Sequence, residues 1–381
     1  MRLTDCHSFH DFRRLAKRRL PGPIFNYIDG AADDEVTYRR NTASFESCDL
    51  VPNVLHGVAD VDMSVTVMGQ KLAMPIYCSP TALQRLFHHR GERAVAAAAS
   101  KFGTMFGVSS LGTVSLEELR QAYDTPQAYQ FYFHKDHGLN RAMMDKAKEA
   151  GVNVMMLTVD SITGGNRERD LRTGFSIPLR LTLAGMIQFA IKPAWGINYL
   201  THEPFKLPQI DDFIDMSGTS LSIGRYFTEM LDPAMNWDHV SELVQRWDGQ
   251  FCLKGVMSVA DARRAVDIGC TGIILSNHGG RQLDGSRAPF DQLAEIVDAV
   301  GDRIDVIMDS GIQRGTHVLK ALSLGAKAVG GGRFYLYPLA AAGQAGVERA
   351  LTLMREEIER GMKLMGCTSL GQLSRENIRF Q

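Results

Sequence analysis

The chain has 381 residues, of which 45% are hydrophobic and 22% are charged, and its formal net charge is −1 at pH 7. These values are typical of a globular protein and provide no basic surface for nucleic acid, so a nucleic-acid-binding function is not expected. The length suits two average domains or one large α/β barrel, and no low-complexity linker divides the chain. We therefore expect residues 1–381 to form a single domain.

The cysteine pattern and the N-terminal residues indicate the cellular compartment in which the protein is expected. Six cysteines are scattered without a CxxC pair or zinc spacing, which predicts reduced thiols, no metal site and a cytoplasmic protein. Residues 13–19 are basic, but no apolar run follows them, so no signal peptide is expected. The longest apolar tract, residues 181–195, is interrupted by Gln188, Lys192 and Pro193, so it is expected to lie on a bilayer at most, not to cross it.

Short apolar segments alternate with helix-like segments, which is the pattern of a parallel α/β fold. Eight of them are predicted as strands, the number that a closed (β/α)8 TIM barrel needs. They are residues 74–78, 104–108, 128–132, 153–159, 251–254, 272–275, 305–308 and 327–330. The spacing of apolar residues predicts helices at residues 91–102, 139–150, 259–268 and 316–324.

Two regions depart from this alternation. Residues 1–70 precede the first strand and are predicted to be an N-terminal helical extension, with helices over residues 7–19 and 25–38. Residues 161–250 lie between the fourth and fifth strands and are far longer than an ordinary loop. We expect them to form an insertion that covers the active site as a lid.

The run from Ser276 to Asp284 follows an apolar strand-like segment and combines the groups that an acid–base site requires. His278 can exchange a proton near neutral pH, the glycines after it allow close approach of a ligand, and Arg281 offers a planar fork for a carboxylate or phosphate. A surface turn needs the glycines but has no use for the imidazole and guanidinium. The exit of the sixth strand is therefore the first candidate site.

Other strand exits also carry polar groups, as expected for an active site of such a barrel. Asp160 can orient an imidazole and stabilise its protonated form. Lys254 ends the fifth strand, so its ammonium either faces an anion or snorkels to the barrel rim. Gly311 and Gly332, with Arg333, are the expected phosphate site, although a tight loop explains the glycines equally well.

A charged run follows Asp160 directly. Arg167 is expected near the barrel mouth, where it can pair with Arg281 to hold a substrate carboxylate, since two guanidinium forks fix both position and orientation. Arg169 is expected to be solvated surface.

Together these motifs resemble those of the FMN-dependent L-2-hydroxy-acid dehydrogenase and oxidase family, which includes glycolate oxidase, flavocytochrome b2, L-lactate dehydrogenase and mandelate dehydrogenase. The resemblance covers nearly the whole chain. Besides residues 276–284, it rests on Leu20-Pro21, Phe25-Asn26-Tyr27, Pro80-Thr81-Ala82, Gln130-Phe131-Tyr132, Thr158-Val159-Asp160, Asn166-Arg167-Glu168 and Gly332-Arg333.

The resemblance implies that FMN is the cofactor and that an L-2-hydroxy acid is oxidised to the 2-oxo acid. By the same resemblance, His278 would be the base and Asp160 would stabilise its imidazolium, while the sequence leaves open whether the proton comes from the α-carbon or from the hydroxyl. Tyr132 would contact the substrate hydroxyl oxygen. The carboxylate would be bound by Tyr27 and Arg281, with Arg167 nearby.

The resemblance also implies the flavin contacts. Lys254 would stabilise negative charge on the reduced flavin and Asp309 would contact the ribityl chain. The phosphate would lie at Gly311, Gly332 and Arg333. The remaining contacts would be Pro80, Thr81, Ala82, Ser109, Gln130, Thr158, Ser276 and Gln313. Gln313 stands where many family members have Arg, so Arg314 or backbone donors would have to replace that charge.

Substrate and acceptor are less well specified. We favour L-lactate as the substrate and a quinone or cytochrome as the electron acceptor; the alternative is an oxygen-using oxidase of the glycolate or mandelate type. Another FMN-barrel enzyme would lack the paired arginines Arg167 and Arg281. A non-catalytic flavin-binding protein would have no need of His278, Asp160 and Tyr132.

The insertion suggests contact with a membrane or with another subunit. Residues 175–237 resemble the insertion of bacterial respiratory lactate dehydrogenases and also that of mandelate dehydrogenase, which attaches to the membrane. The resemblance implies peripheral contact with the cytoplasmic face of the inner membrane. A lid packed on the barrel or a subunit contact is an alternative of equal weight, and the family implies a homotetramer. The proposed interfacial residues are Leu179, Leu181, Leu183, Met186, Ile187, Phe189, Ile191, Lys192, Trp195 and Tyr199.

Overall fold

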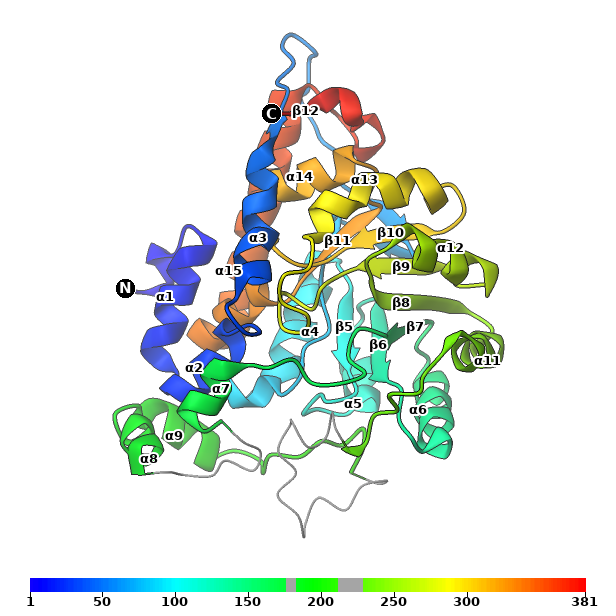
Figure 1. Ribbon diagram of the computed structural model, residues 1–381. Coiled ribbons are helices and arrows are strands. Elements are labelled where there is room, and N and C mark those ends of the chain that lie inside the picture. The colour runs from blue at the N-terminus through cyan, green and yellow to red at the C-terminus, as the bar shows by residue number, and fades with distance from the viewer. Residues whose placement is uncertain (176–182, 212–228) are drawn as a thin grey trace.

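The computed structural model describes residues 1–175, 183–211 and 229–381, and its centre is a closed barrel of eight parallel strands (Figure 1). The strands follow one another around the barrel in chain order until β11 pairs with β4. They are β4 (Ile76–Cys78), β5 (Phe106–Ser109), β6 (Gln127–Tyr132), β7 (Val154–Thr158), β8 (Gln250–Val256), β9 (Gly272–Leu275), β10 (Asp305–Met308) and β11 (Ala328–Gly331). The predicted TIM barrel is confirmed, and every predicted strand overlaps an observed one.

The barrel strands are continuous apolar runs because both of their faces are covered. One face packs on the surrounding helices and the other fills the barrel interior with a separate apolar cluster that includes Tyr77, Met156 and Ile307. A hairpin of β2 (Val65–Val67) and β3 (Gln70–Leu72) adds Met68 to this cluster. The Met68 N–H donates to the side chain of Asp305, at the start of β10, at 2.5 Å. The hairpin therefore closes the end of the barrel where the strands begin.

Helices surround the barrel, and several begin at a side chain that accepts a first-turn N–H group, such as Asp136, Asn236 and Ser258. The four predicted helices between strands are confirmed as α4, α6, α12 and α14, whereas α5, α11, α13 and α15 were not predicted. The surrounding helices are α4 (Gly91–Phe102), α5 (Leu116–Ala122), α6 (His137–Glu149), α11 (Trp237–Trp247), α12 (Val259–Asp267), α13 (Pro289–Val300), α14 (Gly315–Ser323) and α15 (Arg333–Met365), the last with a break at Ala342 and Gly343.

The N-terminal extension contributes α1 (Phe9–Arg19), α2 (Gly22–Asp29) and α3 (Val36–Ala43). The prediction of one helix over residues 25–38 is therefore wrong. Within the break, the Ala32 N–H donates to the Gly280 carbonyl and the Asp33 N–H to the Asn166 carbonyl, each at 2.9 Å. Hydrogen bonds to distant loops thus replace helical ones at this point.

Short elements complete the fold. β1 (Cys48–Leu50) pairs antiparallel with β12 (Ile378–Phe380), so the C-terminus is tied to the extension. All six cysteines are free and buried. The 3-10 helices are η1 (Leu3–Asp5), η2 (Ser44–Ser47), η3 (Gln84–Leu86), η4 (Leu370–Gln372) and η5 (Arg375–Asn377).

The insertion after β7 contains α7 (Glu168–Thr173), α8 (Leu183–Ala190) and α9 (Pro193–Leu200), which lie beside α2 at the lower left of Figure 1. Trp195 faces the protein: its Nε1 donates to the Leu86 carbonyl at 2.7 Å and its ring stacks on Tyr199. Ile187 and Ile191 are exposed instead.

The predicted interfacial residues are thus divided between exposed and packed side chains, and their contact with a membrane stays a prediction. The rings of Phe189, Trp195 and Tyr199 form one aromatic cluster, and this cluster packs against the core. Leu179, Leu181 and the side chains of Leu183 and Met186 lie outside the described residues. No helix in the described ranges has the length and apolarity needed to cross a bilayer.

Candidate active site

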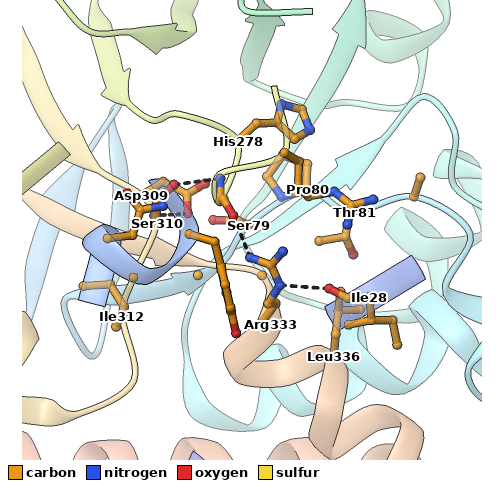
Figure 2. A pocket seen from close by; sticks show the side chains of 18 of the residues that line it. Ile28, Ser79, Pro80, Thr81, His278, Asp309, Ser310, Ile312, Arg333 and Leu336 are labelled. Atoms are coloured by element: carbon orange, nitrogen blue, oxygen red, sulfur yellow. Dashed lines mark hydrogen bonds between the residues drawn. The ribbon is translucent and has the colours of Figure 1, made fainter. Parts of the chain in front are cut away.

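A pocket that opens to solvent lies at the carboxyl ends of the barrel strands. Figure 2 shows His278, Pro80 and Thr81 on one part of its wall, Asp309 and Ser310 on another, and Arg333 beside Ile28 and Leu336. Most of the predicted site residues line it: Tyr27, Pro80, Thr81, Ala82, Ser109, Tyr132, Arg167, Lys254, His278, Arg281, Asp309, Gly311, Gln313, Gly332 and Arg333.

Gln130, Thr158, Ser276 and Asp160 do not line the pocket but lie directly behind residues that do. Ser109 Oγ donates to Gln130 Oε1 at 2.9 Å, and Gln130 Nε2 donates to Thr158 Oγ1 at 2.8 Å. This buried chain of hydrogen bonds runs across three neighbouring strands and fixes the orientation of the Ser109 hydroxyl.

The acid–base pair is formed by His278 and Asp160. His278 Nδ1 lies 3.1 Å from Asp160 Oδ1, and the His278 N–H donates to Ser276 Oγ at 3.1 Å. Because the carboxylate accepts at Nδ1, the neutral imidazole carries its proton there and leaves Nε2 as a proton acceptor.

Electrostatics keep this pair in the forms that proton abstraction needs. Burial lowers the pKa of His278, and the Asp160 carboxylate opposes that shift only in part. Burial alone would raise the pKa of Asp160, but its interaction with His278 holds that pKa below the usual value. At neutral pH the pair is therefore a neutral imidazole beside an ionised carboxylate.

The loop that carries His278 is held by the N-terminal extension. His278 has a φ of 59°, in the left-handed region, so its backbone needs support from its neighbours. The side chains of Asn277 and Asn41 exchange hydrogen bonds of 2.6 and 2.8 Å. Asp284 accepts the first N–H groups of α3, from Val36 and Thr37.

Two guanidinium groups converge on Tyr27. The Cζ atoms of Arg281 and Arg167 lie 5.0 and 5.5 Å from the centroid of the Tyr27 ring. Arg281 Nη1 donates to the carbonyls of Tyr27 at 2.6 Å and Gly30 at 3.0 Å. Burial, followed by the charge of Arg167, lowers the pKa of Arg281 to about 10. In the described part of the chain no carboxylate forms an ion pair with Arg281, so this end of the pocket attracts an anion.

Tyr132 lines the same pocket and is 6% exposed. Burial raises the pKa of its phenol well above the usual value, so the group keeps its proton and can donate a hydrogen bond. Phe175 stacks on Tyr27 with ring centroids 4.5 Å apart, which adds an apolar boundary to the carboxylate end.

Lys254 does not snorkel to the rim. Its ammonium is buried, lies 3.4 Å from Asp309 Oδ2 and donates to Ser276 Oγ at 3.0 Å. A cation and a carboxylate are thus fixed together on the pocket wall, where they can bind a group with both donor and acceptor atoms.

Arg333 occupies the opposite end. Its Nε donates to the Ile28 carbonyl at 2.8 Å, and Nη1 and Nη2 donate to the carbonyls of Gly279 and Gly30 at 2.9 Å (Figure 2). Two of its five N–H bonds remain for a ligand. Arg333 also begins α15, whose first N–H groups have no helical partner, so this end suits a phosphate.

The suggestion that Arg314 replaces the charge missing at Gln313 is wrong, and the reason given for a glycine at position 311 needs revision. Arg314 forms an ion pair with Glu357 at 2.7 Å outside the pocket, so it does not replace the charge missing at Gln313. A Cβ on Gly311 would lie 2.1 Å from the Asn41 carbonyl oxygen, so glycine is required there by the close approach of α3. Arg169 is not simply solvated either, because it forms ion pairs with Asp29 and Glu35.

The sequence interpretation missed pocket residues from the extension. Tyr38, Asn41 and Thr42 line the pocket from one face of α3. Their i, i+3, i+4 spacing is the signal that could have identified a shared helix face.

Comparison with known proteins follows from this geometry. The family model described as FMN-dependent dehydrogenase matches residues 16–380. The chain belongs to that family. The reaction is therefore the FMN-dependent oxidation of a 2-hydroxy acid, and FMN is the cofactor.

Individual relatives agree with this assignment. The chain is 37% identical to a putative L-lactate dehydrogenase of Mycobacterium tuberculosis, over 99% of this chain and 90% of the relative. It is 40% identical to an L-lactate oxidase of Nostoc sp., over 95% of each protein. A solved structure, the monotopic membrane protein (S)-mandelate dehydrogenase, superposes with a TM-score of 0.93 at 32% identity, over 99% of this chain and 100% of that one.

The pocket fits FMN by the chemistry of its donors. The Lys254 ammonium suits the polar edge of a flavin ring, apolar side chains such as Ala82 and Leu111 suit its face, and the Arg333 end suits its phosphate. The same pocket is lined by His278, Arg281 and Tyr132, so the residues proposed to contact the acid lie beside those proposed to contact the cofactor.

Proposed function

We propose that the protein oxidises L-lactate to pyruvate and passes the electrons to a quinone or cytochrome. The observation that carries this proposal is the neutral His278 imidazole, paired with the ionised Asp160, beside the same pocket as the buried guanidinium of Arg281, for which the described residues provide no carboxylate partner. A base beside an anion site is the combination that oxidation of a 2-hydroxy carboxylate requires.

The residues divide the work as follows. Arg281 binds the substrate carboxylate, with Arg167 and Tyr27 beside it, and Tyr132 donates to the hydroxyl oxygen. His278 Nε2 accepts a proton from the substrate, and Asp160 stabilises the resulting imidazolium at Nδ1. FMN, when bound, supplies the redox chemistry by accepting the two electrons that the substrate loses.

FMN would be held by the pocket residues already described. Lys254 and Asp309 hold the polar edge and the ribityl chain, and Gly332 and Arg333 hold the phosphate. The groups behind the wall, Gln130, Thr158 and Ser276, keep these contacts in place.

L-Lactate is favoured among the 2-hydroxy acids because the curated relatives are named L-lactate dehydrogenases or an L-lactate oxidase. The apolar boundary formed by Phe175 and Phe87 on Tyr27 is consistent with a small substrate side chain. (S)-Mandelate is the second candidate, since a mandelate dehydrogenase superposes over the whole chain.

The test is anaerobic mixing of the yellow holoenzyme with L-lactate, D-lactate, glycolate and (S)-mandelate. L-Lactate is expected to bleach the flavin fastest and D-lactate not at all. Faster bleaching by (S)-mandelate would replace the substrate assignment, and no bleaching by any acid would overturn the function. Readmitted oxygen is expected to restore the yellow colour slowly; rapid recovery would identify an oxidase.

The acceptor proposal includes contact with the cytoplasmic face of the inner membrane. The insertion exposes apolar side chains: Ile191 is 66%, Leu200 79% and Leu171, on α7, 73% exposed. Basic residues of α1 lie alongside, since Lys192 Nζ donates to the Arg18 carbonyl at 2.6 Å. Exposed apolar tips beside positive charge are the combination that binds an anionic lipid surface.

Co-sedimentation with vesicles containing an anionic phospholipid tests this contact. The double variant Ile191→Ser, Leu200→Ser is expected to lose vesicle binding while it reduces a soluble dye at the wild-type rate. Val54→Ser is the matched control, because Val54 is 77% exposed on a different loop. Equal sedimentation of all three proteins would remove the membrane proposal and leave the oxidation untouched.

A further inference from the structure

The carboxyl end of α2 connects two of the arginines that line the pocket, Arg281 and Arg333. Arg281 Nη1 donates to the carbonyls of Tyr27 and Gly30, at 2.6 and 3.0 Å, and Arg333 Nη2 donates to the same Gly30 carbonyl at 2.9 Å. Arg333 Nε also donates to the Ile28 carbonyl at 2.8 Å. The last carbonyls of a helix lack helical partners and form the negative end of its dipole, so they attract both cations.

Asp29 fixes this helix end from behind. It is 1% exposed and accepts hydrogen bonds from Arg13 Nε at 2.6 Å, Arg169 Nη1 at 2.8 Å and the Tyr337 hydroxyl at 2.6 Å. Burial alone would raise the pKa of Asp29, but the hydrogen bonds from Arg13 and Tyr337 hold it below the usual value, so the carboxylate stays ionised. One buried charge thereby joins α1, α2, α7 and α15.

The same carboxylate also fixes the insertion side of the pocket. Arg169 lies two residues after Arg167, whose guanidinium faces the Tyr27 ring from 5.5 Å. Arg169 additionally pairs with Glu35, in the break between α2 and α3. The position of Arg167 relative to Tyr27 therefore depends on the ion pair between Arg169 and Asp29.

We propose that Asp29 is a positioning residue that couples the substrate-carboxylate site to the flavin-phosphate site. It touches neither ligand; it holds the carbonyls that orient Arg281 and Arg333, and it holds the loop that carries Arg167. Loss of its charge releases both ends of the pocket together and leaves the His278–Asp160 pair in place. The substrate half of this inference rests on the proposed function, and the flavin half does not.

The first experiment uses the Asp29→Asn holoenzyme, because asparagine keeps the shape and removes the charge. We expect KM for the hydroxy acid to rise about tenfold and FMN, followed by its fluorescence after dilution, to leave about tenfold faster. The turnover number at saturation and the acid limb of the pH profile stay at wild-type values, because His278 is untouched. Unchanged FMN release would overturn the coupling, even where the melting temperature has fallen.

A second variant separates the two halves and serves if Asp29→Asn does not fold. Arg169→Met removes only the insertion side, so KM is expected to rise while FMN release stays at the wild-type rate. Arg172→Met is the matched control on the same helix, where Arg172 is 75% exposed and pairs with Glu168. Equal KM values for the two variants would contradict the proposed role of Arg169.

The outcomes also distinguish this inference from the proposed function. FMN release needs no substrate, so faster release from Asp29→Asn supports the flavin half even when no hydroxy acid bleaches the wild-type protein. Failure of bleaching alone therefore counts against the oxidation, and failure of the release difference counts against Asp29.

Discussion

The two ends of the substrate site are built from different parts of the molecule. Lys254 lies in β8, and Asp160 and His278 lie just beyond the ends of β7 and β9. The carboxylate end combines Arg281, on the loop after β9, with Tyr27 of α2 and Arg167 of the insertion, both outside the barrel. Under the proposed function, the barrel strands and their exits supply the chemistry, and the surrounding elements add to recognition of the substrate carboxylate. Substitutions at the first end should lower turnover, and substitutions at the second should weaken substrate binding.

The largest effect is expected for His278→Ala. Removal of the base should slow flavin reduction by L-lactate about 10⁴-fold, since proton abstraction then has no acceptor at the reacting atom. Bound FMN should be retained. Anaerobic stopped-flow absorbance measures the rate, with exposed His10→Ala as the control. Reduction within tenfold of the wild-type rate would assign the base to another group.

Asp160→Asn is expected to have the next largest effect, about 10³-fold on turnover, because the imidazolium loses its stabilising charge. KM should change little, since Asp160 does not line the pocket. Steady-state kinetics with a soluble dye separates the two parameters. A change confined to KM would place Asp160 on the recognition side of the comparison.

Arg281→Lys tests the other end. We expect kcat/KM to fall about 10²-fold, chiefly through KM, because an ammonium cannot form the two parallel hydrogen bonds of a guanidinium. Arg287→Lys is the control, because Arg287 is 53% exposed and pairs with Glu295. A loss of turnover without a change in KM would show that recognition and chemistry are not separated as proposed.

The smallest effect concerns pH. His278 must be neutral to act as a base, so kcat/KM should fall about tenfold per pH unit below its pKa, which lies below the ordinary value of 6.5. Asp160 favours the protonated imidazole, so Asp160→Asn should move this acid limb to still lower pH. A limb that moves upward in that variant would contradict the pairing.

The sequence predicted the barrel end far better than the recognition end, for a physical reason. Parallel strands bring their carboxyl ends together by topology alone, so locating the strand exits was enough to place His278 near Asp160 and Lys254. The partners of Arg169 and Asn277 lie more than a hundred residues away in the extension. No local pattern encodes such contacts.

The same reason explains the errors in the extension. The break in residues 25–38 is stabilised by Gly280 and Asn166, and the glycine at position 311 is required by α3. Each residue type was correctly noted, but the neighbour that selects it came from a distant segment. The hairpin β2–β3 was missed because its strands have three residues each, too few for a periodic signal.

That hairpin has a kinetic consequence. Val67, Met68 and Leu72 fill the end of the barrel where the strands begin, and they have no exposed surface. Substrate, product and electron acceptor must therefore share the mouth at the opposite end, and they occupy it in turn. We expect the enzyme to alternate between an oxidised form, which reacts with the hydroxy acid, and a reduced form, which reacts with the electron acceptor. Double-reciprocal plots of rate against L-lactate, at several concentrations of a soluble acceptor, should then be parallel lines.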